Sequence, residues 1–275
     1  MTAPDASGVG RPGHPETADA PLPGRGLDLG TWIAPVVSVI LILALWQATV
    51  LVFRLPRFVL PPPLDVLTAL VNNLPILLRD TWITGRETVA GFFLSILVAV
   101  PLAILINLSA PLRNGIYPFL LLGQSVPKQA IAPLLLLWIG YGEVPRVILA
   151  FLTAFFPIVV NTAIGLQMTP PEMQDLGRLL SASRRRVFFK VTFPSAMPYF
   201  FAGLKVAISL AVIGAVIGEF IGGDTGLGQR ILVASGNQRT DLAFAAILML
   251  SLLGILLFTL VALAEKILCP WYDKS

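Results

Sequence analysis

Long apolar runs separated by short polar segments dominate this sequence. A bilayer core about 30 Å thick needs roughly 20 apolar residues in a helix, and two runs of this length carry charged residues. Ile116–Gly140 contains Lys128, and Tyr199–Gly223 contains Lys205 and Glu219. Four further runs carry no charge: Trp32–Phe53, Thr88–Leu108, Val147–Met168 and Leu242–Ala264. Together the six runs predict an all-α polytopic membrane protein with six transmembrane helices.

The connection between the first two predicted spans is rich in proline. Pro61, Pro62 and Pro63 end any preceding helix, because proline lacks the amide proton and clashes with the turn before it. Leu64–Leu78 then places apolar residues at helical spacing. This pattern predicts a short amphipathic helix at the membrane interface.

Composition supports a membrane protein and excludes several other classes. Of 275 residues, 56% are hydrophobic and 12% are charged, and the mean hydropathy is +0.84. A soluble domain of this length could not shield so much apolar surface from water. The net charge of +4 indicates basic residues at membrane faces rather than nucleic-acid binding. A single cysteine, Cys269, and a single histidine, His14, predict no disulfide, no metal site and no catalytic imidazole, and no cofactor is expected.

Basic residues predict the orientation of the spans. Residues 1–30 are rich in Pro, Gly, Ala and Asp without apolar periodicity, so we expect a disordered tail ahead of a membrane domain over 31–275. Six spans place both termini on one side, which carries eleven Lys and Arg residues against seven on the other. The excess of basic residues predicts that both termini, and the connection 169–198, are cytoplasmic.

The connection Thr169–Pro198, between the fourth and fifth predicted spans, is polar but patterned. Its acidic residues lie near the start of a predicted short helix, where they complement the helix dipole. Ser181-Ala182-Ser183 follows as a turn of small residues. A second short helix is predicted over Arg184–Val191, ending before Phe193-Pro194 because the residue before proline avoids the helical conformation. Two short helices around a small-residue turn favour a docking element for a soluble partner.

The same segment resembles the EAA loop of permease subunits in bacterial ATP-binding-cassette importers. That signature has the form E-A-A, three residues, G, nine residues, I, one residue, L-P. Asp175-Leu176-Gly177, Ser181, Val191 and Phe193-Pro194 stand at the matching positions. Ser181 replaces the glycine, which is the largest departure from the signature.

Three further segments are similar to the nitrate, sulfonate and taurine branch of these permeases. They are Leu60–Leu70, Pro127–Leu166 and Ile217–Ile231. The resemblance extends from about Trp32 to the C-terminus. It implies a protein of the plasma (inner) membrane that transports solute and catalyses no reaction.

The resemblance also implies partners and a mechanism. Two permease copies, here expected as a homodimer, would form the pathway, and each EAA loop would supply a coupling helix that docks on a cytoplasmic ATPase subunit. ATP binding would close the ATPase pair and turn the pathway outward to accept solute from a binding protein. The implied solutes are nitrate, alkanesulfonates or taurine, or vitamin precursors of the pyrimidine or riboflavin type. The docking residues carried over by position are Glu172, Asp175, Gly177, Ser181 and Ala182.

Ionisable and polar residues within the spans are candidates for the translocation pathway. Lys128 lies about 18 Å from the cytoplasmic end of its predicted span. It is either a pathway cation suited to anionic solutes or a lysine satisfied by neighbouring carbonyls. Glu219 lies about 30 Å in, near the outer face, which favours an interfacial acid and argues against a simple pair with Lys128. Asn161 either faces the pathway or hydrogen-bonds between helices.

Two other classes compete with an importer permease. A self-contained secondary transporter or channel would not need an ordered cytoplasmic loop, and usually shows more intramembrane acids or half-repeats. An intramembrane hydrolase lacks a candidate histidine and an H-E-x-x-H sequence. The chain also has no phosphate-binding G-x-x-x-x-G-K-[ST] sequence of its own.

We expect Lys128→Met to lower the transport of an anionic solute, because the substitution removes a cation from the pathway. The measurement is uptake by the reconstituted importer. Unchanged uptake of an anionic solute would exclude Lys128 from the pathway.

Overall fold

A computed structural model describes residues 29–271 except 170–171, 174–178 and 180–181. The predicted tail therefore lies almost entirely outside the described residues. The chain forms two units, Met1–Trp46 and Gln47–Ser275. All regular structure in the described part is helical, which confirms the predicted all-α class. The helices are α1 (Leu29–Val52), α2 (Pro63–Asn72), α3 (Leu74–Leu108), α4 (Ala110–Ser125), α5 (Lys128–Ile139), α6 (Glu143–Gln167), α8 (Arg184–Val187), α9 (Phe193–Gly222), α10 (Leu227–Gly236) and α11 (Thr240–Leu268).

Four continuous helices in the described part are long and apolar enough to cross a membrane. They are α3, α6, the helix Arg185–Gly222 that contains α9, and α11. The pair α4 and α5 forms at most a fifth span. Within α1, which carries no charged residue, Val36–Val52 is a shorter apolar helix. The membrane class is thus confirmed, whereas the predicted count of six continuous spans is not.

The third predicted span, 116–140, is a bent pair rather than one helix. Helices α4 and α5 meet at 93°. Val126 between them has an extended conformation, with φ −69° and ψ 124°. The cause is Pro127, which disfavours the helical conformation of the residue before it.

The predicted interfacial helix over Leu64–Leu78 is also divided. Helix α2 ends at Asn72, and Asn73 donates its side-chain Nδ2 to the Ala69 carbonyl at 2.7 Å. Helix α3 then begins at Leu74 with Pro75 in its first turn, where the missing amide proton is harmless. With 35 residues, α3 is about 52 Å long and so exceeds the hydrocarbon core.

The chain stays helical through Phe193-Pro194, contrary to the predicted break there. Phe188–Thr192 forms a π-helical segment, and Phe193 donates its amide to the Phe188 carbonyl, five residues back. Phe193 itself is helical, with φ −66° and ψ −47°. The wider π turn accommodates the proline without ending the helix. The fifth predicted span, 199–223, is therefore the later part of a longer helix.

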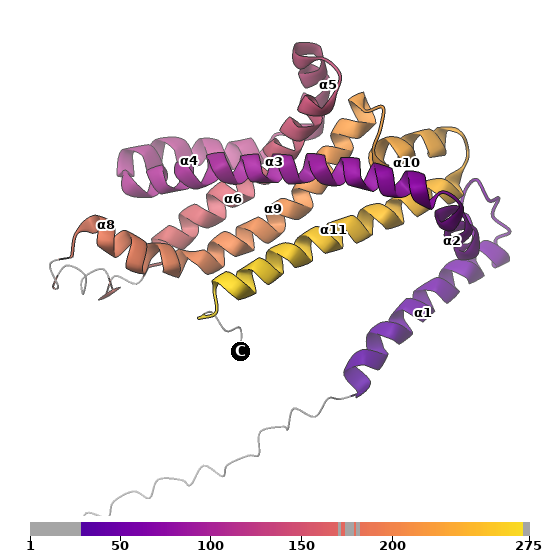
Figure 1. Cartoon of the computed structure of the whole chain (residues 1–275), viewed down its shortest axis with the longest axis horizontal. Helices are drawn as coiled ribbons and strands as arrows, with labels where there is room; N and C mark the ends of the chain where they lie inside the picture. The colour runs from indigo at the N-terminus through magenta and orange to yellow at the C-terminus, as the bar shows by residue number, and fades with distance from the viewer. Residues whose placement is uncertain (1–28, 170–171, 174–178, 180–181, 272–275) are drawn as a thin grey trace, which may run out of the picture. The chain divides into compact units, whose positions relative to one another are not determined.

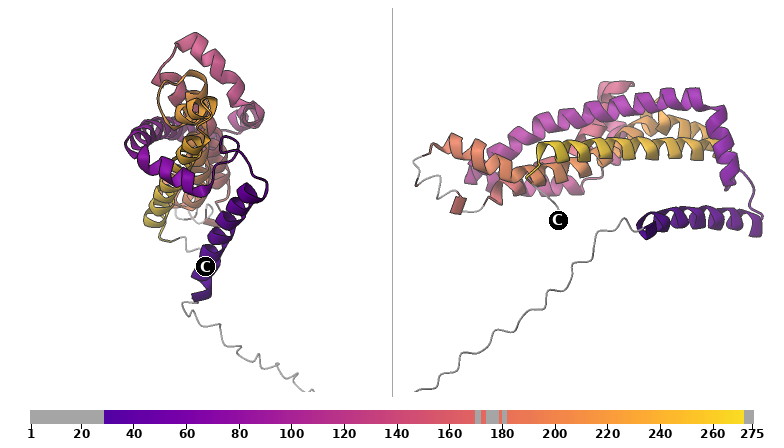
Figure 2. Two further views of the ribbon diagram at one scale, coloured as in Figure 1. Left: turned by 90° about the vertical axis from the view of Figure 1, so that its right-hand side faces the viewer. Right: turned by 60° about the horizontal axis from the view of Figure 1, so that its bottom comes forward.

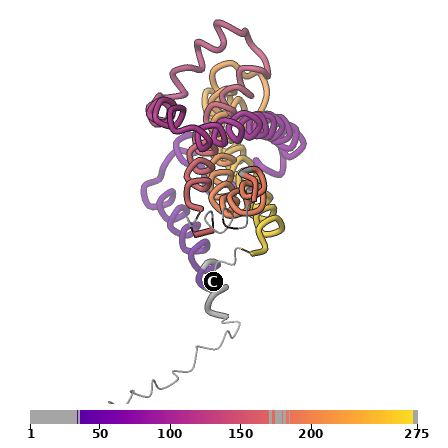
Figure 3. Tube along the Cα trace, turned by 90° about the vertical axis from the view of Figure 1, so that its left-hand side faces the viewer, coloured from indigo at the N-terminus to yellow at the C-terminus, as the bar shows by residue number. Residues whose placement is uncertain are grey.

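Helices α6 and α9 form the centre of the second unit, with α3 on α6 and α11 on α9 (Figure 1). Helices α2 and α10 lie beside the N-terminal part of α11 (Figure 2). Seen from the α8 end, α3 and α11 lie on different sides of the central pair (Figure 3). Small side chains dominate this core and let the helices approach closely. Those buried here include Ala99, Ala103, Ala150, Ala154, Ala163, Ala207, Ala211 and Ala215.

We expect Gly214→Ala to destabilise the α6–α9 contact by about 1–3 kcal/mol, the usual cost of overpacking. A Cβ at Gly214 would lie 2.6 Å from the Leu149 carbonyl oxygen and would also collide with Thr153. Gly254→Ala on α11 is the matched control, since a Cβ there meets no atom within 4 Å. Thermal unfolding of the purified variants in detergent measures the difference. Equal melting temperatures for the two variants would contradict the prediction.

Candidate functional site

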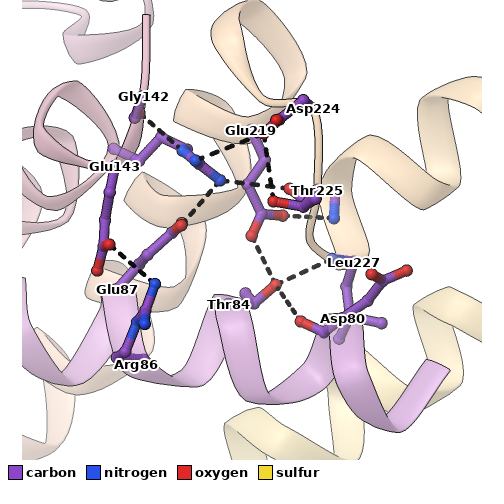
Figure 4. A network of polar contacts seen from close by, with 12 residues as sticks. Asp80, Thr84, Arg86, Glu87, Gly142, Glu143, Glu219, Asp224, Thr225 and Leu227 are labelled. Carbon is purple, nitrogen blue, oxygen red and sulfur yellow. Dashed lines mark hydrogen bonds and ion pairs between the residues drawn. The ribbon is translucent and has the colours of Figure 1, made fainter. Parts of the chain in front are cut away.

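Polar groups gather at both ends of the α6–α9 pair. At one end, the connection 168–183 joins the C-terminus of α6 to α8 and α9. At the other end lie the N-terminus of α6, which carries Arg146, and the C-terminus of α9, which carries Glu219. Figure 4 shows Glu219 beside Thr84 of α3. These ends are about 37 Å apart, since α6 has 25 residues and an α-helix rises 1.5 Å per residue.

A stripe of three polar residues on α3 forms the centre of the second end. Asp80, Thr84 and Glu87 are spaced at i, i+4 and i+7, so they share one face of the helix. Their exposed fractions are 2%, 0% and 0%. Each member of this α3 polar stripe meets a different helix. The pairs are Asp80 Oδ2 with Arg230 Nε on α10 at 2.8 Å, Thr84 Oγ1 with Glu219 Oε1 on α9 at 2.6 Å, and Glu87 Oε1 with Arg146 Nη1 on α6 at 2.8 Å.

The Arg146 side chain is only 6% exposed and has polar partners on several sides. Its Nε donates to the Gly142 carbonyl at 2.9 Å and its Nη1 to the Thr225 carbonyl at 3.3 Å. The Glu87 carboxylate lies at ion-pair distance from the guanidinium, but its oxygens are not aligned for a hydrogen bond. Asp224, largely exposed, lies 3.8 Å from Nη2. The guanidinium therefore joins α3, α6 and the connection after α9.

Glu219 is bound differently, by two uncharged donors. Thr84 donates to one carboxylate oxygen, and the Gly228 amide donates to the other at 2.5 Å. Within the described residues, no lysine or arginine forms an ion pair with it. Gly226 has φ +105°, a conformation that favours glycine, and a Cβ at Gly226 or Gly228 would collide with Glu219. The glycine-rich connection thus wraps closely around a buried carboxylate.

The predicted docking residues fall on the least described part of the chain. Asp175, Gly177 and Ser181 lie outside the described residues. Glu172 is exposed, and Ala182 is half-buried just before α8. Leu179, between them, is 83% exposed. The structure therefore leaves the docking assignment as a prediction.

The predicted pathway residues do not come together. Lys128, at the N-terminus of α5, donates to the Gln124 carbonyl at 2.6 Å and lies 5.0 Å from the centroid of the Phe156 ring. This contact agrees with the alternative of a lysine satisfied by a neighbouring carbonyl. Asn161 donates within its own helix, to the Pro157 carbonyl at 2.8 Å. Glu219 is fully buried in the polar network rather than exposed at an interface.

Sequence reasoning missed most of this network. The apolar pattern places Asp80 and Arg146 in external connections, because charged residues bound the apolar runs. Thr84 and Glu87 fall in the same charged stretch before Thr88. The i, i+4, i+7 spacing of polar residues just before an apolar run was the available signal, since it marks one helical face.

Comparisons with known proteins agree on one family. The model for binding-protein-dependent transport system inner membrane components matches residues 91–270. The formylaminopyrimidine transport permease protein ThiX of Halalkalibacterium halodurans is 32% identical over 248 residues, covering 88% of this chain and 97% of that protein. The riboflavin transport system permease protein RibX of Chloroflexus aurantiacus is 34% identical over 237 residues, covering 86% and 88%. More distant relatives, at 27% identity, are an aliphatic sulfonate permease of Bacillus subtilis and a nitrate permease of Synechocystis.

A solved structure confirms the fold. The inward-facing MetNI methionine ABC transporter contains a chain that matches with a TM-score of 0.62 and 18% identity, covering 72% of this chain and 98% of that chain. None of these matches supports the alternative of a secondary transporter or channel.

We expect Arg146→Met to destabilise the protein by about 3–5 kcal/mol, because it leaves the buried Glu87 carboxylate unpaired. The double variant Glu87→Gln/Arg146→Met removes both charges and should recover much of that loss. Arg57→Met is the control, since the Arg57–Asp65 pair is exposed and its loss changes little. Melting temperatures in detergent decide the matter. A double variant that is less stable than Arg146→Met would contradict the pairing.

Proposed function

The chain belongs to the family of binding-protein-dependent transport system inner membrane components, and is a permease of an ATP-binding-cassette importer rather than an enzyme. On this basis, we propose that it couples solute passage to a separate ATPase through the loop 169–198. An ATPase and a solute-binding protein are the partners that this family implies. The residues proposed for docking are Glu172, Asp175, Gly177, Ser181 and Ala182.

The packing of α6 on α9 supports this proposal most directly. The loop leaves from α6 and returns into α9, so a displacement of the loop acts on both helices at once. The two helices pack closely because Gly203, Gly214 and Gly218 leave no room for a Cβ between them. Close-packed helices move as a unit rather than deforming independently. A push on the loop therefore reaches the opposite end of the pair.

Exposure supports the choice of surface. Met173 and Leu179 are large apolar residues that are 49% and 83% exposed in the loop. Exposed apolar side chains rimmed by polar residues mark protein interaction sites. We assign this side, together with both termini, to the cytoplasm, and the opposite end to the face that meets the binding protein. We further propose that two copies of the chain form the pathway.

For the solute, we propose a small molecule such as a sulfonate, taurine or nitrate, or a vitamin precursor of the pyrimidine or riboflavin type. The names of the relatives support this range, since they include formylaminopyrimidine, riboflavin, aliphatic sulfonates and nitrate. We propose Lys128, partly exposed at the α4–α5 bend, as the cation that an anionic solute would meet in place of the Gln124 carbonyl. The ligand that co-purifies with the partner binding protein decides among these classes.

We expect Ala182→Arg to reduce the amount of ATPase that co-purifies with the permease by at least about tenfold, because bulk and charge enter the docking surface. Asn114→Arg, at the exposed start of α4, is the control for adding an arginine on the same side of the bundle. Both variants should insert into the membrane at the wild-type level. Normal recovery of the ATPase with Ala182→Arg would refute the docking assignment.

A further inference from the structure

Glu219 is the one buried acid of the network without a cationic partner in the described structure. Asp80 and Glu87 each face an arginine. Glu219, with an exposed fraction of 0%, is held only by the Thr84 hydroxyl and the Gly228 amide. Burying a carboxylate in this way costs free energy relative to packing an apolar side chain. Fold stability alone therefore does not account for a glutamate here.

The Thr84 hydroxyl has a second partner, which connects α3 to the start of α10. The Leu227 amide donates to Thr84 Oγ1 at 2.9 Å. Leu227 is the first residue of α10, and its side chain is fully buried. One hydroxyl group thus joins the α9 carboxylate to the first turn of α10, in the centre of the α3 polar stripe (Figure 4).

The glycine connection Gly223–Gly226 runs from the end of α9 to α10, and the Gly223 amide donates a hydrogen bond to the Glu219 carbonyl. Arg146 contacts the middle of this connection, through the Thr225 carbonyl at 3.3 Å and the exposed Asp224 at 3.8 Å. Gly226 and Gly228 approach the carboxylate so closely that no Cβ fits. The positions of Gly226 and Gly228 therefore depend on where the Glu219 side chain lies.

We propose that Glu219 is a positioning residue for transport. Through Thr84 Oγ1 and Gly228 N, it locks the Gly223–Gly226 connection and the start of α10 to α3. A displacement of α9 that begins at the coupling loop is thereby delivered to α10, at the end of the bundle that faces the binding protein. This inference rests on the proposed function, because it requires the loop 169–198 to move with the ATPase.

The test compares Thr84→Val with Thr84→Ser in the complete importer reconstituted in lipid nanodiscs. Valine keeps the shape of threonine but removes the hydroxyl, whereas serine keeps the hydroxyl. Both variants also carry Ser235→Cys, which introduces a thiol at an exposed position on α10. Cys269→Ser removes the native thiol of the permease, so that labelling by a membrane-impermeant maleimide reports on α10. The readouts are ATP hydrolysis with and without the binding protein, and maleimide labelling with and without ATP and vanadate.

With Thr84→Ser, we expect stimulated hydrolysis near the wild-type rate and labelling that changes with nucleotide. With Thr84→Val, we expect stimulation by the binding protein to fall by about tenfold, and labelling of the thiol introduced on α10 to become independent of nucleotide. The amount of co-purified ATPase should stay the same, which a general loss of folding would not allow. Stimulation within about twofold of wild type in Thr84→Val would overturn the proposal.

Glu219→Leu decides the matter if Thr84→Val is too unstable to purify. Leucine has neither donor nor acceptor, so both the Thr84 hydroxyl and the Gly228 amide lose their contact with this side chain. Stimulation and nucleotide-dependent labelling at wild-type levels in this variant would likewise overturn the proposal. Failure of the wild-type permease to bind the ATPase at all would instead refute the proposed function, and so the two failures are distinguishable.

Discussion

The close contact between α6 and α9 is the constraint on which the other features of this molecule depend. The contact exists because glycine and alanine occupy the facing positions, so that backbone atoms of one helix lie against the other. In a membrane, where lipid is as apolar as leucine, such packing rather than the exclusion of water holds helices together. The same pair carries the proposed docking loop at one end and the buried polar network at the other. A larger residue at this interface would therefore weaken the coupling of motion between the two ends of the pair, even if the loop and the network both remained intact.

Much of the fold could be predicted from the apolar pattern, because membrane helices must satisfy their backbone hydrogen bonds within each helix. The all-α class follows from that requirement. The pattern was less informative where proline intervened. Pro127 bends its span by 93°, whereas Pro194 is absorbed by a π-helical turn. Pro127 and Pro194 have the same local chemistry. Their different effects depend on which backbone hydrogen bonds the surrounding helix can rearrange, and a rule about single residues does not include this.

The buried network could not be predicted for a different reason. Thr84 and Glu219 are 135 residues apart, and Asp80 and Arg230 are 150 residues apart. A charged residue near an apolar run normally indicates the end of a span, since an unpaired charge in lipid is costly. A partner from a distant helix offsets part of that cost, and α3 continues through Glu87 and Asp80 without interruption. The proposed docking loop shows the opposite case, since its signature is local and lies within residues 175–194.

The π-helical segment Phe188–Thr192 has a consequence for how the loop is aimed. A π turn holds about one residue more than an α turn, and each residue of an α-helix rotates the chain by roughly 100°. Helix α8, which directly precedes Phe188, is therefore turned by about that angle, relative to α9, from where an unbroken α-helix would place it. The direction in which the side chains of α8 point around the helix axis is thus set by the one additional residue of the π turn. A deletion of one residue in this segment would turn the loop to a new direction while leaving its sequence unchanged.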